Sequence, residues 1–431
     1  MRLKNKKVLV YGLGDSGRAV IKILQSHLAH VSFYDDNPQF WDYVGFVRDP
    51  MDKPFDLVIL SPGVSVRGNT LLENFEKRKI PVLSELDFAF LHSKGRIVAI
   101  TGTNGKTTVS MLVHRILKEA GFSTFLCGNI GLPFSAICEK TTKESVVVCE
   151  VSNFQLETSK FFKPFVAGIL NIKPDHLDRH GNFEEYVKTK EKIAMNLKRN
   201  HTLVLNLDDE ISRGLSSHKK RLYFSKKVLK KGVFVQNLQI FYGKKKLLDL
   251  SDIPLRGEKN LENVLASISF CIPFKVTNNA LKNAISTFSP AGHRMEIVGS
   301  INGVTYVDDS KATNVASVVA CVEAFKDERI VLLVGGKGKE IDYGELFSLG
   351  FSIKEVVCFG EEANNIFSSA TGFGYNCSLF EKFDEAVLYT IDKAQSGDYV
   401  LLSPACSSFD EFSSYAERGE RFKTLVLGSV K

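Results

Sequence analysis

The sequence has few cysteines, and they do not form closely spaced pairs. Its 431 residues include eight cysteines without a C-x-x-C spacing, and several stand inside apolar runs such as "VVVCEV". Disulfide frameworks and zinc sites both need cysteines at suitable spacings. The pattern therefore argues against both and predicts reduced, buried thiols in a cytoplasmic protein.

Long apolar runs and aromatic-rich basic motifs are absent as well. No apolar run approaches the length of about 18 residues that suggests a membrane-spanning helix, and the chain starts directly with a strand-like pattern. The formal charge of +7 is modest, and lysine clusters at 226–231 and 244–246 stand beside glycines, as in exposed hairpin loops. We therefore expect a soluble protein with neither a membrane nor a nucleic-acid partner.

Short runs of valine, isoleucine and leucine alternate with helical patterns through most of the chain. This alternation predicts an α/β fold with largely parallel sheets. There is no internal repeat and no low-complexity linker. We predict three domains at 1–91, 92–289 and 290–431, and short antiparallel strands between 221 and 255.

The stretch "VYGLGDSGRAV" contains a complete G-x-G-x-x-G at Gly12, Gly14 and Gly17, directly after an apolar run. With the acidic Asp35 about 20 residues further on, the spacing fits a dinucleotide fingerprint in a Rossmann-like domain. Glycines in such a turn let a diphosphate approach the backbone. The motif predicts a bound diphosphate and leaves open whether NAD or another nucleotide carries it.

The strongest local signal is "VAITGTNGKTTVSML" at 98–112, where a buried strand ends in a Gly-rich turn before a helix. Backbone N–H groups and the helix N-terminus form an anion nest there for the phosphates of a nucleotide. Lys106 is expected to reach the β- and γ-phosphates, and the Thr107 hydroxyl to ligate Mg²⁺. Ile100 stands where the strict P-loop has glycine, so the loop is a shortened, P-loop-like relative.

Two further segments carry candidate metal ligands. Glu150 closes the apolar strand "SVVVCEVS", where a carboxylate is costly unless it is paired or bound to a metal. The loop "NIKPDHLDRHG" sets Asp175, His176 and Asp178 close together after the next strand. A buried N-capping carboxylate remains the alternative for Glu150.

The segment "NFEEYVKTKEKIAMNLK" predicts a helix from Asn182, with Asn182 as its N-cap. Its apolar stripe runs through Phe183, Tyr186 and Ile193 at helical spacing, and Lys190 falls on that stripe. An inward lysine either extends its ammonium to solvent or meets an anion or a chemical modification. The residues alone leave these readings open.

Polar residues follow three apolar runs in the last third of the chain, in "YVDDSKATN", "LLVGGKGKE" and "LLSPACSSFDEF". Ligands of open α/β sheets bind beyond the carboxyl ends of the strands. Lysine, threonine and serine side chains that converge there suit a small substrate rich in carboxylates. Each cluster alone could be a helix cap, and the three together favour a site.

These motifs, in this order, resemble the Mur ligase family of ATP-dependent amide ligases, over the whole chain. The segments that carry the resemblance are "GTNGKTT", "CEVSNFQLE", "ILNIKPDHLDRHG", the helix with Lys190, "GEKNLENVLAS", "AGHRMEIV", "VDDSKATNV" and "LLSPACSSFDEF". The last two, with "GLGDSG" and "GNIGLP", look most like the member that joins D-glutamate to UDP-N-acetylmuramoyl-L-alanine. Asn37 stands where some relatives carry arginine.

The resemblance assigns roles residue by residue. It implies catalytic roles for Lys106, Lys190 and His176, and metal ligation by Thr107, Glu150, His176 and Lys190, with Lys190 carbamylated. It implies ATP binding by Gly102, Thr103, Asn104, Gly105, Lys106, Thr107, Thr108, Asn260, Asn263, Arg294, Asp309 and Lys311. It implies binding of the UDP-sugar by Gly14, Asp15, Ser16, Asp35, Asp36 and Asn129, and of D-glutamate by Lys311, Thr313, Lys339, Ser408 and Tyr415.

The resemblance also implies the reaction. ATP and Mg²⁺ are expected to activate the alanyl carboxylate as an acyl phosphate, which the amine of D-glutamate attacks, in peptidoglycan precursor synthesis. The domains are then expected to be a UDP-sugar-binding Rossmann-like domain, a central ATPase domain and a Rossmann-like amino-acid-binding domain, in a monomer. The alternatives are a Mur ligase for another amino acid, an NAD-dependent oxidoreductase that uses Gly12–Gly17, and a nucleotide-gated binding protein.

Overall fold

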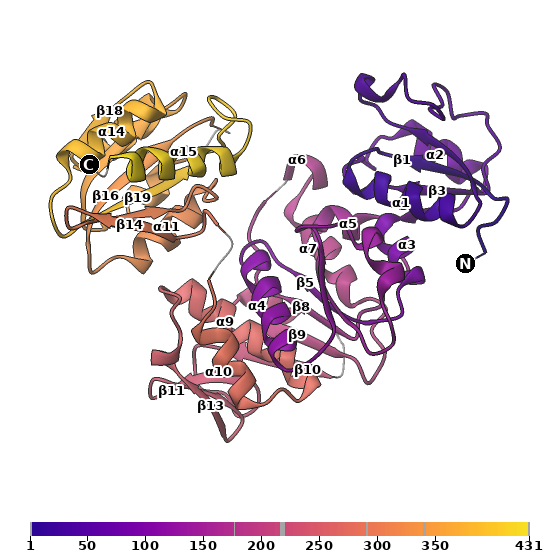
Figure 1. The fold of residues 1–431 in the computed structure, drawn as a ribbon, viewed down its shortest axis with the longest axis horizontal. Helices are drawn as coiled ribbons and strands as arrows, with labels where there is room; N and C mark the ends of the chain where they lie inside the picture. The colour runs from indigo at the N-terminus through magenta and orange to yellow at the C-terminus, as the bar shows by residue number, and fades with distance from the viewer. Residues whose placement is uncertain (1, 176, 216–219, 290–291, 339–341, 430–431) are drawn as a thin grey trace. The chain divides into compact units, whose positions relative to one another are not determined.

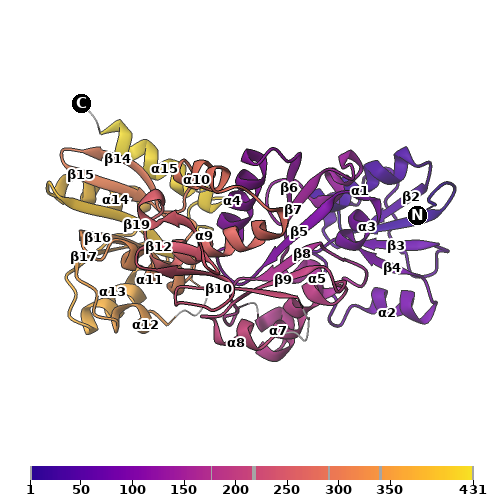
Figure 2. The same ribbon diagram turned by 90° about the horizontal axis from the view of Figure 1, so that it is seen from below.

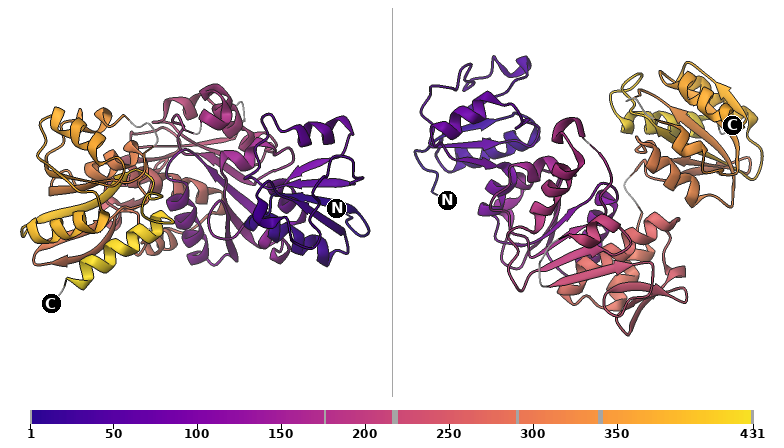
Figure 3. Two further views of the ribbon diagram at one scale, coloured as in Figure 1. Left: turned by 90° about the horizontal axis from the view of Figure 1, so that it is seen from above. Right: turned by 180° about the vertical axis from the view of Figure 1, so that it is seen from behind.

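The computed structural model describes residues 2–175, 177–215, 220–289, 292–338 and 342–429. Their strands form three sheets, of four, nine and six strands (Figure 1). Each sheet is built from one continuous stretch of the chain, as the colour gradient in Figure 3 shows. Contacts group residues 1–254 and 262–288 into one compact unit, and residues 255–261 and 289–431 into a second. The predicted α/β class with mainly parallel sheets is confirmed, and the three domain boundaries stay a prediction.

The first sheet has the strand order β2-β1-β3-β4, with every pair parallel. Its elements are β1 (Lys7–Tyr11), α1 (Asp15–Ser26), β2 (His30–Tyr34), β3 (Leu57–Leu60), α2 (Thr70–Lys77), β4 (Val82–Ser84) and α3 (Glu85–His92). Alternate residues of β1 face opposite ways, so that Val8 and Val10 pack with α1, and Leu9 and Tyr11 pack with α2. Helices therefore cover both faces, as expected for a parallel sheet.

The second sheet has the order β13-β12-β11-β10-β9-β8-β5-β7-β6. Its strands are β5 (Arg96–Thr101), β6 (Thr124–Gly128), β7 (Val146–Glu150), β8 (Val166–Ile169), β9 (Thr202–Asn206), β10 (Arg221–Ser225), β11 (Val233–Gln236), β12 (Gln239–Tyr242) and β13 (Lys245–Asp249). The helices of this region are α4 (Lys106–Glu119), α5 (Asn153–Glu157), α6 (Leu177–His180), α7 (Phe183–Glu191), α8 (Glu210–Gly214), α9 (Glu258–Cys271) and α10 (Asn278–Ser286). One hydrophobic core runs from the first sheet into this one.

The prediction of short antiparallel strands between 221 and 255 is correct only in part. β10 pairs in parallel with both β9 and β11, and only the β11–β12 and β12–β13 pairs are antiparallel. Short strands between glycine turns suggest hairpins from the sequence alone. The direction of β10 is set by its tertiary pairing with β9, which no local pattern reveals.

The third sheet has the order β14-β15-β19-β16-β17-β18, with only the β14–β15 pair antiparallel. Its strands are β14 (Glu296–Ile301), β15 (Val304–Asp308), β16 (Arg329–Gly335), β17 (Ile353–Phe359), β18 (Cys377–Leu379) and β19 (Asp398–Ala405). Its helices are α11 (Val315–Ala324), α12 (Gly344–Phe347), α13 (Ala363–Gly372), α14 (Phe383–Lys393) and α15 (Tyr415–Gly428). Figure 2 shows α14 and α15 on one face and α11, α12 and α13 on the other.

All eight cysteines are free thiols, and seven of them are buried, as predicted. Among the described residues, every helix is too short or too polar to cross a lipid bilayer.

A fully buried carboxylate, Asp87 on α3, ties the first sheet's helices to the second sheet's region. It accepts hydrogen bonds from Ser159 Oγ and from the backbone N–H groups of residues 160–162, at 2.7–3.0 Å. We expect Asp87→Ala to lower the free energy of unfolding by about 3 kcal/mol, because four donors lose their acceptor. Urea denaturation measures this loss.

Asp87→Asn is the control for that prediction. Its remaining oxygen can keep the three bonds that Oδ1 accepts, so it should lose less than Asp87→Ala. Equal midpoints for wild type and Asp87→Ala in urea would contradict the anchoring role.

Candidate active site

The phosphate loop lies between β5 and α4, where the sequence predicts it. The backbone N–H of Thr103 donates to the Asn171 carbonyl (3.0 Å), and the N–H of Asn104 donates to Asn171 Oδ1 (2.8 Å). Gly105 caps α4 with φ +85°, and a Cβ there would collide with the Asn263 side-chain amide. These contacts hold the loop in front of a 14-residue helix, whose first N–H groups favour an anion.

Two lysine side chains donate to the same backbone carbonyl of this loop. Lys106 Nζ donates to the carbonyls of Gly102 and Thr103, both at 2.9 Å, and Lys190 Nζ donates to the same Gly102 carbonyl at 3.1 Å. A single carbonyl oxygen thus accepts from two lysine side chains. We infer that the loop is built to receive additional negative charge.

Lys190 is buried, with 1% of its surface exposed, and its Nζ lies 4.6 Å from the centroid of the Tyr186 ring. The predicted inward position is confirmed, because helix α7 turns Tyr186 and Lys190 to the same face, and the alternative of a solvent-reaching ammonium is wrong. Asn182 caps the helix, as predicted, by accepting from the Glu185 N–H at 2.9 Å. Burial, helped by repulsion from Lys106, lowers the pKa of Lys190 to about 7.

Glu150 ends β7 and is 2% exposed. Its Oε1 accepts from Asn129 Nδ2 at 2.8 Å, whereas its Oε2 is buried without a hydrogen-bond donor among the described residues. A buried carboxylate oxygen without a donor is costly unless a cation or another partner binds it. A carboxylate and the hydroxyl of Thr107, which begins α4 with Lys106, are the oxygen ligands that Mg²⁺ prefers, so the residues present fit this metal.

Beside this region lies a cavity of about 820 Å³. Its lining includes all six residues predicted for the UDP-sugar, namely Gly14, Asp15, Ser16, Asp35, Asp36 and Asn129. Asp35 Oδ2 accepts from the Leu13 N–H at 2.6 Å, and Asp36 Oδ2 accepts from the Tyr11 hydroxyl at 2.9 Å. The structure therefore brings these residues together around one space.

The cavity has further walls that the sequence analysis missed. They are formed by the loop after β3 at 61–65 and by the start of α5, with Ser152, Phe154 and Gln155. The segment "CEVSNFQLE" contains the α5 residues, but nothing in the sequence places them opposite a loop 90 residues earlier. That proximity arises only when the two sheets pack.

The second unit gathers other predicted residues. Lys311 Nζ lies 3.7 Å from the centroid of the Tyr415 ring, and Ser408 is buried. Asp309 is buried and accepts from Ser403 Oγ (2.9 Å) and the Met295 N–H (3.2 Å). Burial raises the pKa of Asp309 to about 7. Two of the predicted ligands, Lys311 and Tyr415, are thus in direct contact.

The remaining predicted residues are placed as follows. Gly102–Thr108, Glu150, Lys190 and Asn263 belong to the first unit, and Asn260, Arg294, Asp309, Lys311, Thr313, Ser408 and Tyr415 belong to the second. His176 and Lys339 lie outside the described residues.

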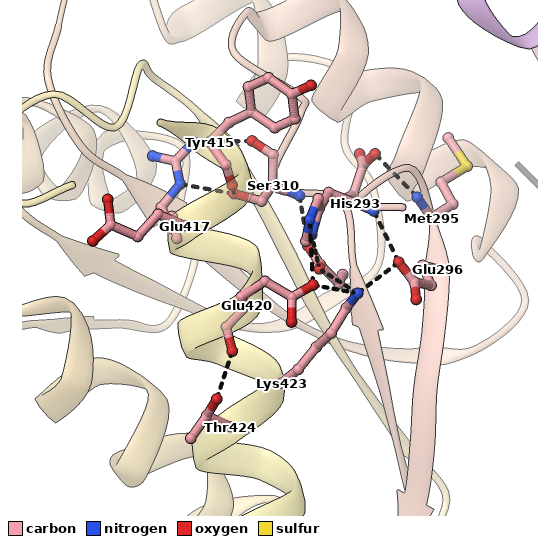
Figure 4. A network of polar contacts seen from close by, with 12 residues as sticks. His293, Met295, Glu296, Ser310, Tyr415, Glu417, Glu420, Lys423 and Thr424 are labelled. Atoms are coloured by element: carbon pink, nitrogen blue, oxygen red, sulfur yellow. Dashed lines mark hydrogen bonds and ion pairs between the residues drawn. The ribbon is translucent and has the colours of Figure 1, made fainter. Parts of the chain in front are cut away.

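A network of charged side chains next to Arg294 and Asp309 was also missed (Figure 4). His293 Nδ1 lies 2.6 Å from Asp308 Oδ2, and Lys423 Nζ lies 3.0 Å from Glu296 Oε2 and 3.1 Å from Glu420 Oε1. His293, Glu296 and Asp308 are close enough to share a metal ion. The Lys423 ammonium already supplies the positive charge there, so the cluster is better explained as a structural network.

Arg418 on α15 is fully buried and connects two loops of the second unit. It donates to Ser310 Oγ, to the Ser310 and Cys406 carbonyls at 3.0 Å, and to the Ser407 carbonyl at 3.2 Å. Within "YAERGERF" it looks like an ordinary surface charge. Its role depends on loops about 10 and 110 residues earlier, which the sequence does not show to be neighbours.

A mostly parallel α/β sheet with a phosphate-loop motif, a buried lysine and a buried carboxylate is typical of proteins that bind nucleotide phosphates. Residues 100–271 match the family model described as the Mur ligase middle domain, and residues 293–406 match that of the Mur ligase, glutamate ligase domain. The chain belongs to the Mur ligase family of ATP-dependent, amide-forming ligases. This confirms the family predicted from the motifs.

Curated relatives match over nearly the full length. The UDP-N-acetylmuramoylalanine–D-glutamate ligase of Thermoanaerobacter sp. (strain X514) is 37% identical over 99% of both chains. The enzyme of the same name from Caldicellulosiruptor bescii is 38% identical over 99% of this chain and 98% of its own. Family membership of this extent disfavours the oxidoreductase alternative, which used one motif only.

Solved structures share the fold. UDP-N-acetylmuramate-alanine ligase MurC from Thermotoga maritima has a TM-score of 0.63 at 20% identity, covering 99% of this chain and 100% of its own. MurF ligase from Thermotoga maritima, solved in complex with ADP, has a TM-score of 0.62 at 17% identity, covering 99% and 96%. At these identities the likeness concerns the fold alone.

Proposed function

We propose that this chain joins D-glutamate to UDP-N-acetylmuramoyl-L-alanine with ATP, in peptidoglycan precursor synthesis. One observation carries the proposal. A phosphate loop, the buried Lys190 and Glu150, whose Oε2 is buried without a hydrogen-bond donor among the described residues, all lie beside the 820 Å³ cavity. The names of relatives that match over 99% of the chain support the choice of substrates. The free, mostly buried thiols fit a reducing cytoplasm, and the monomeric state stays a prediction.

The phosphate loop would bind the ATP phosphates. Lys106 would leave the Gly102 and Thr103 carbonyls and offset charge on the phosphoryl group as it moves to the alanyl carboxylate. Thr107 and Glu150 would hold Mg²⁺, with His176 at a second ion. When bound, Mg²⁺ would supply charge neutralisation for the transferring group.

Lys190 would act as a carbamate. Its neutral amine nitrogen would attack the carbon of CO₂ and release one proton, which turns a neutral amine into an anion beside Lys106. A carbamate there would remove the repulsion between the Lys106 and Lys190 side chains, which both donate to the Gly102 carbonyl. The carbamate oxygens would then serve as metal ligands.

The second unit would bind D-glutamate and part of ATP. Lys311, Thr313, Lys339 and Ser408 would bind the amino acid's carboxylates, with Tyr415 beside Lys311. Asn260 and Asn263 would contact the adenine, Asp309 the ribose, and Arg294 the phosphates. The D-glutamate amine would attack the acyl phosphate, giving an amide and inorganic phosphate.

The decisive experiment is a substrate panel. Purified protein with ATP, Mg²⁺ and UDP-N-acetylmuramoyl-L-alanine should release phosphate with D-glutamate but not with L-alanine or meso-diaminopimelate. Mass spectrometry should detect the product with one added glutamyl residue. Phosphate release with another amino acid would select a different Mur ligase reaction, and ATP binding without amide product would favour a nucleotide-gated binding protein.

The charge state of Lys190 gives a pH prediction. Because burial lowers its pKa to about 7, the amine is mostly protonated at pH 6 and mostly neutral at pH 8. Only the neutral form reacts with CO₂, so the carbamate signal in NMR spectra with ¹³C-labelled bicarbonate should rise several-fold between these pH values. The Lys190→Met variant supplies the blank. A signal that stays flat up to pH 9 would contradict the lowered pKa.

A further inference from the structure

The cavity proposed for the sugar nucleotide has two walls that come from different sheets. One wall is the loop after β3, which includes Pro62, Gly63 and Val64. The other is the start of α5, which includes Phe154 and Gln155. Their separation decides whether a ligand that touches both can fit.

The side chain of Arg179 on α6 contacts residues of both cavity walls. Its Nη2 donates to the Pro62 carbonyl at 3.1 Å and to the Val64 carbonyl at 2.9 Å. Its guanidinium carbon lies 4.2 Å from the centroid of the Phe154 ring, where a cation–π contact forms. Both contacts are therefore made to residues that line the cavity.

An ion pair holds this guanidinium in place. Glu157, at the end of α5, accepts from Arg179 Nη2 at 2.7 Å and from Nε at 3.1 Å. The two side chains are 14% and 16% exposed, so the pair is shielded from solvent. His180 stacks on Phe154 with an interplanar angle of 14°, which restrains the same ring from the same helix.

We propose that Arg179 is a positioning residue for the sugar-nucleotide pocket, which sets the distance between its two walls. This inference rests on the proposed function for the identity of the ligand. The planar guanidinium suits the task because it donates in several directions while its face stacks on an aromatic ring. A lysine ammonium lacks that planar fork, so the role should not transfer to Lys.

The test compares Arg179→Lys and Arg179→Ala with the wild type and with Arg199→Ala, an exposed arginine after α7. Calorimetry should show UDP-N-acetylmuramoyl-L-alanine binding at least about tenfold more weakly to both Arg179 variants. In the steady state, KM for the sugar nucleotide should rise similarly, while KM for ATP and for D-glutamate stays within twofold. Arg199→Ala should match the wild type in all of these.

Glu157→Ala separates positioning from simple stabilisation. It removes the ion pair but keeps the carbonyl and ring contacts of Arg179, so it should lower the melting temperature with a smaller rise in sugar-nucleotide KM. Equal binding by Arg179→Lys and wild type would overturn the inference, as would a parallel rise of all three KM values. Failure of the wild type itself to bind the sugar nucleotide would refute the proposed function, and the inference with it.

Discussion

Replacing Lys190 with alanine is expected to reduce kcat at least about a hundredfold. The reason is the position of Lys190, which is buried and whose Nζ donates to the Gly102 carbonyl of the phosphate loop. In the proposed carbamate form, the variant loses a negatively charged metal ligand. Initial rates of phosphate release at saturating substrates measure the loss.

Rescue distinguishes loss of the carbamate from loss of folding. Short-chain carboxylic acids place a carboxylate in the vacated space and should restore part of the activity of Lys190→Ala, with no effect on the wild type. Lys188→Ala is the matched control, because Lys188 lies on the same helix, is 55% exposed and forms ion pairs with Glu184 and Glu185 on the helix surface. Full activity of Lys190→Ala without additives would remove the carbamate from the mechanism.

Lys106→Ala is also expected to have a large effect, with kcat lower by about a thousandfold. Its ammonium donates to the Gly102 and Thr103 carbonyls of the phosphate loop itself. Loss of a preorganised charge at a transferring phosphoryl group raises the barrier more than it weakens ATP binding. Isothermal titration with ATP and single-turnover rates separate the two effects.

The same substitution should change Lys190. Repulsion from Lys106 contributes to the lowered pKa of Lys190, so its removal should raise that pKa and shift the rise of the carbamate signal to higher pH. Lys118→Ala, on the exposed face near the end of α4, is the control and should leave both readouts unchanged. An unchanged carbamate profile in Lys106→Ala would mean that burial alone sets the pKa of Lys190.

Features that depend on neighbouring residues were predictable from the sequence. The Gly-rich turn before Lys106, the carboxylate at the end of β7 and the Asn182 cap each rest on a few consecutive positions. The inward direction of Lys190 follows from the 3.6-residue period of a helix, which places it on the same side as Tyr186. The alternation of strands and helices also sufficed for the α/β class.

Features that join distant segments were decided by the tertiary structure. The parallel direction of β10, the Asn129–Glu150 bond, the Arg179 contacts to residues 62–64 and the burial of Arg418 all link positions between about 10 and 117 residues apart. In the sequence, Arg179 and Arg418 are two charges among many. Only the packing of sheets and helices removes them from water and gives each its acceptors, because a buried guanidinium is stable only where the fold supplies carbonyls and carboxylates from several segments at once.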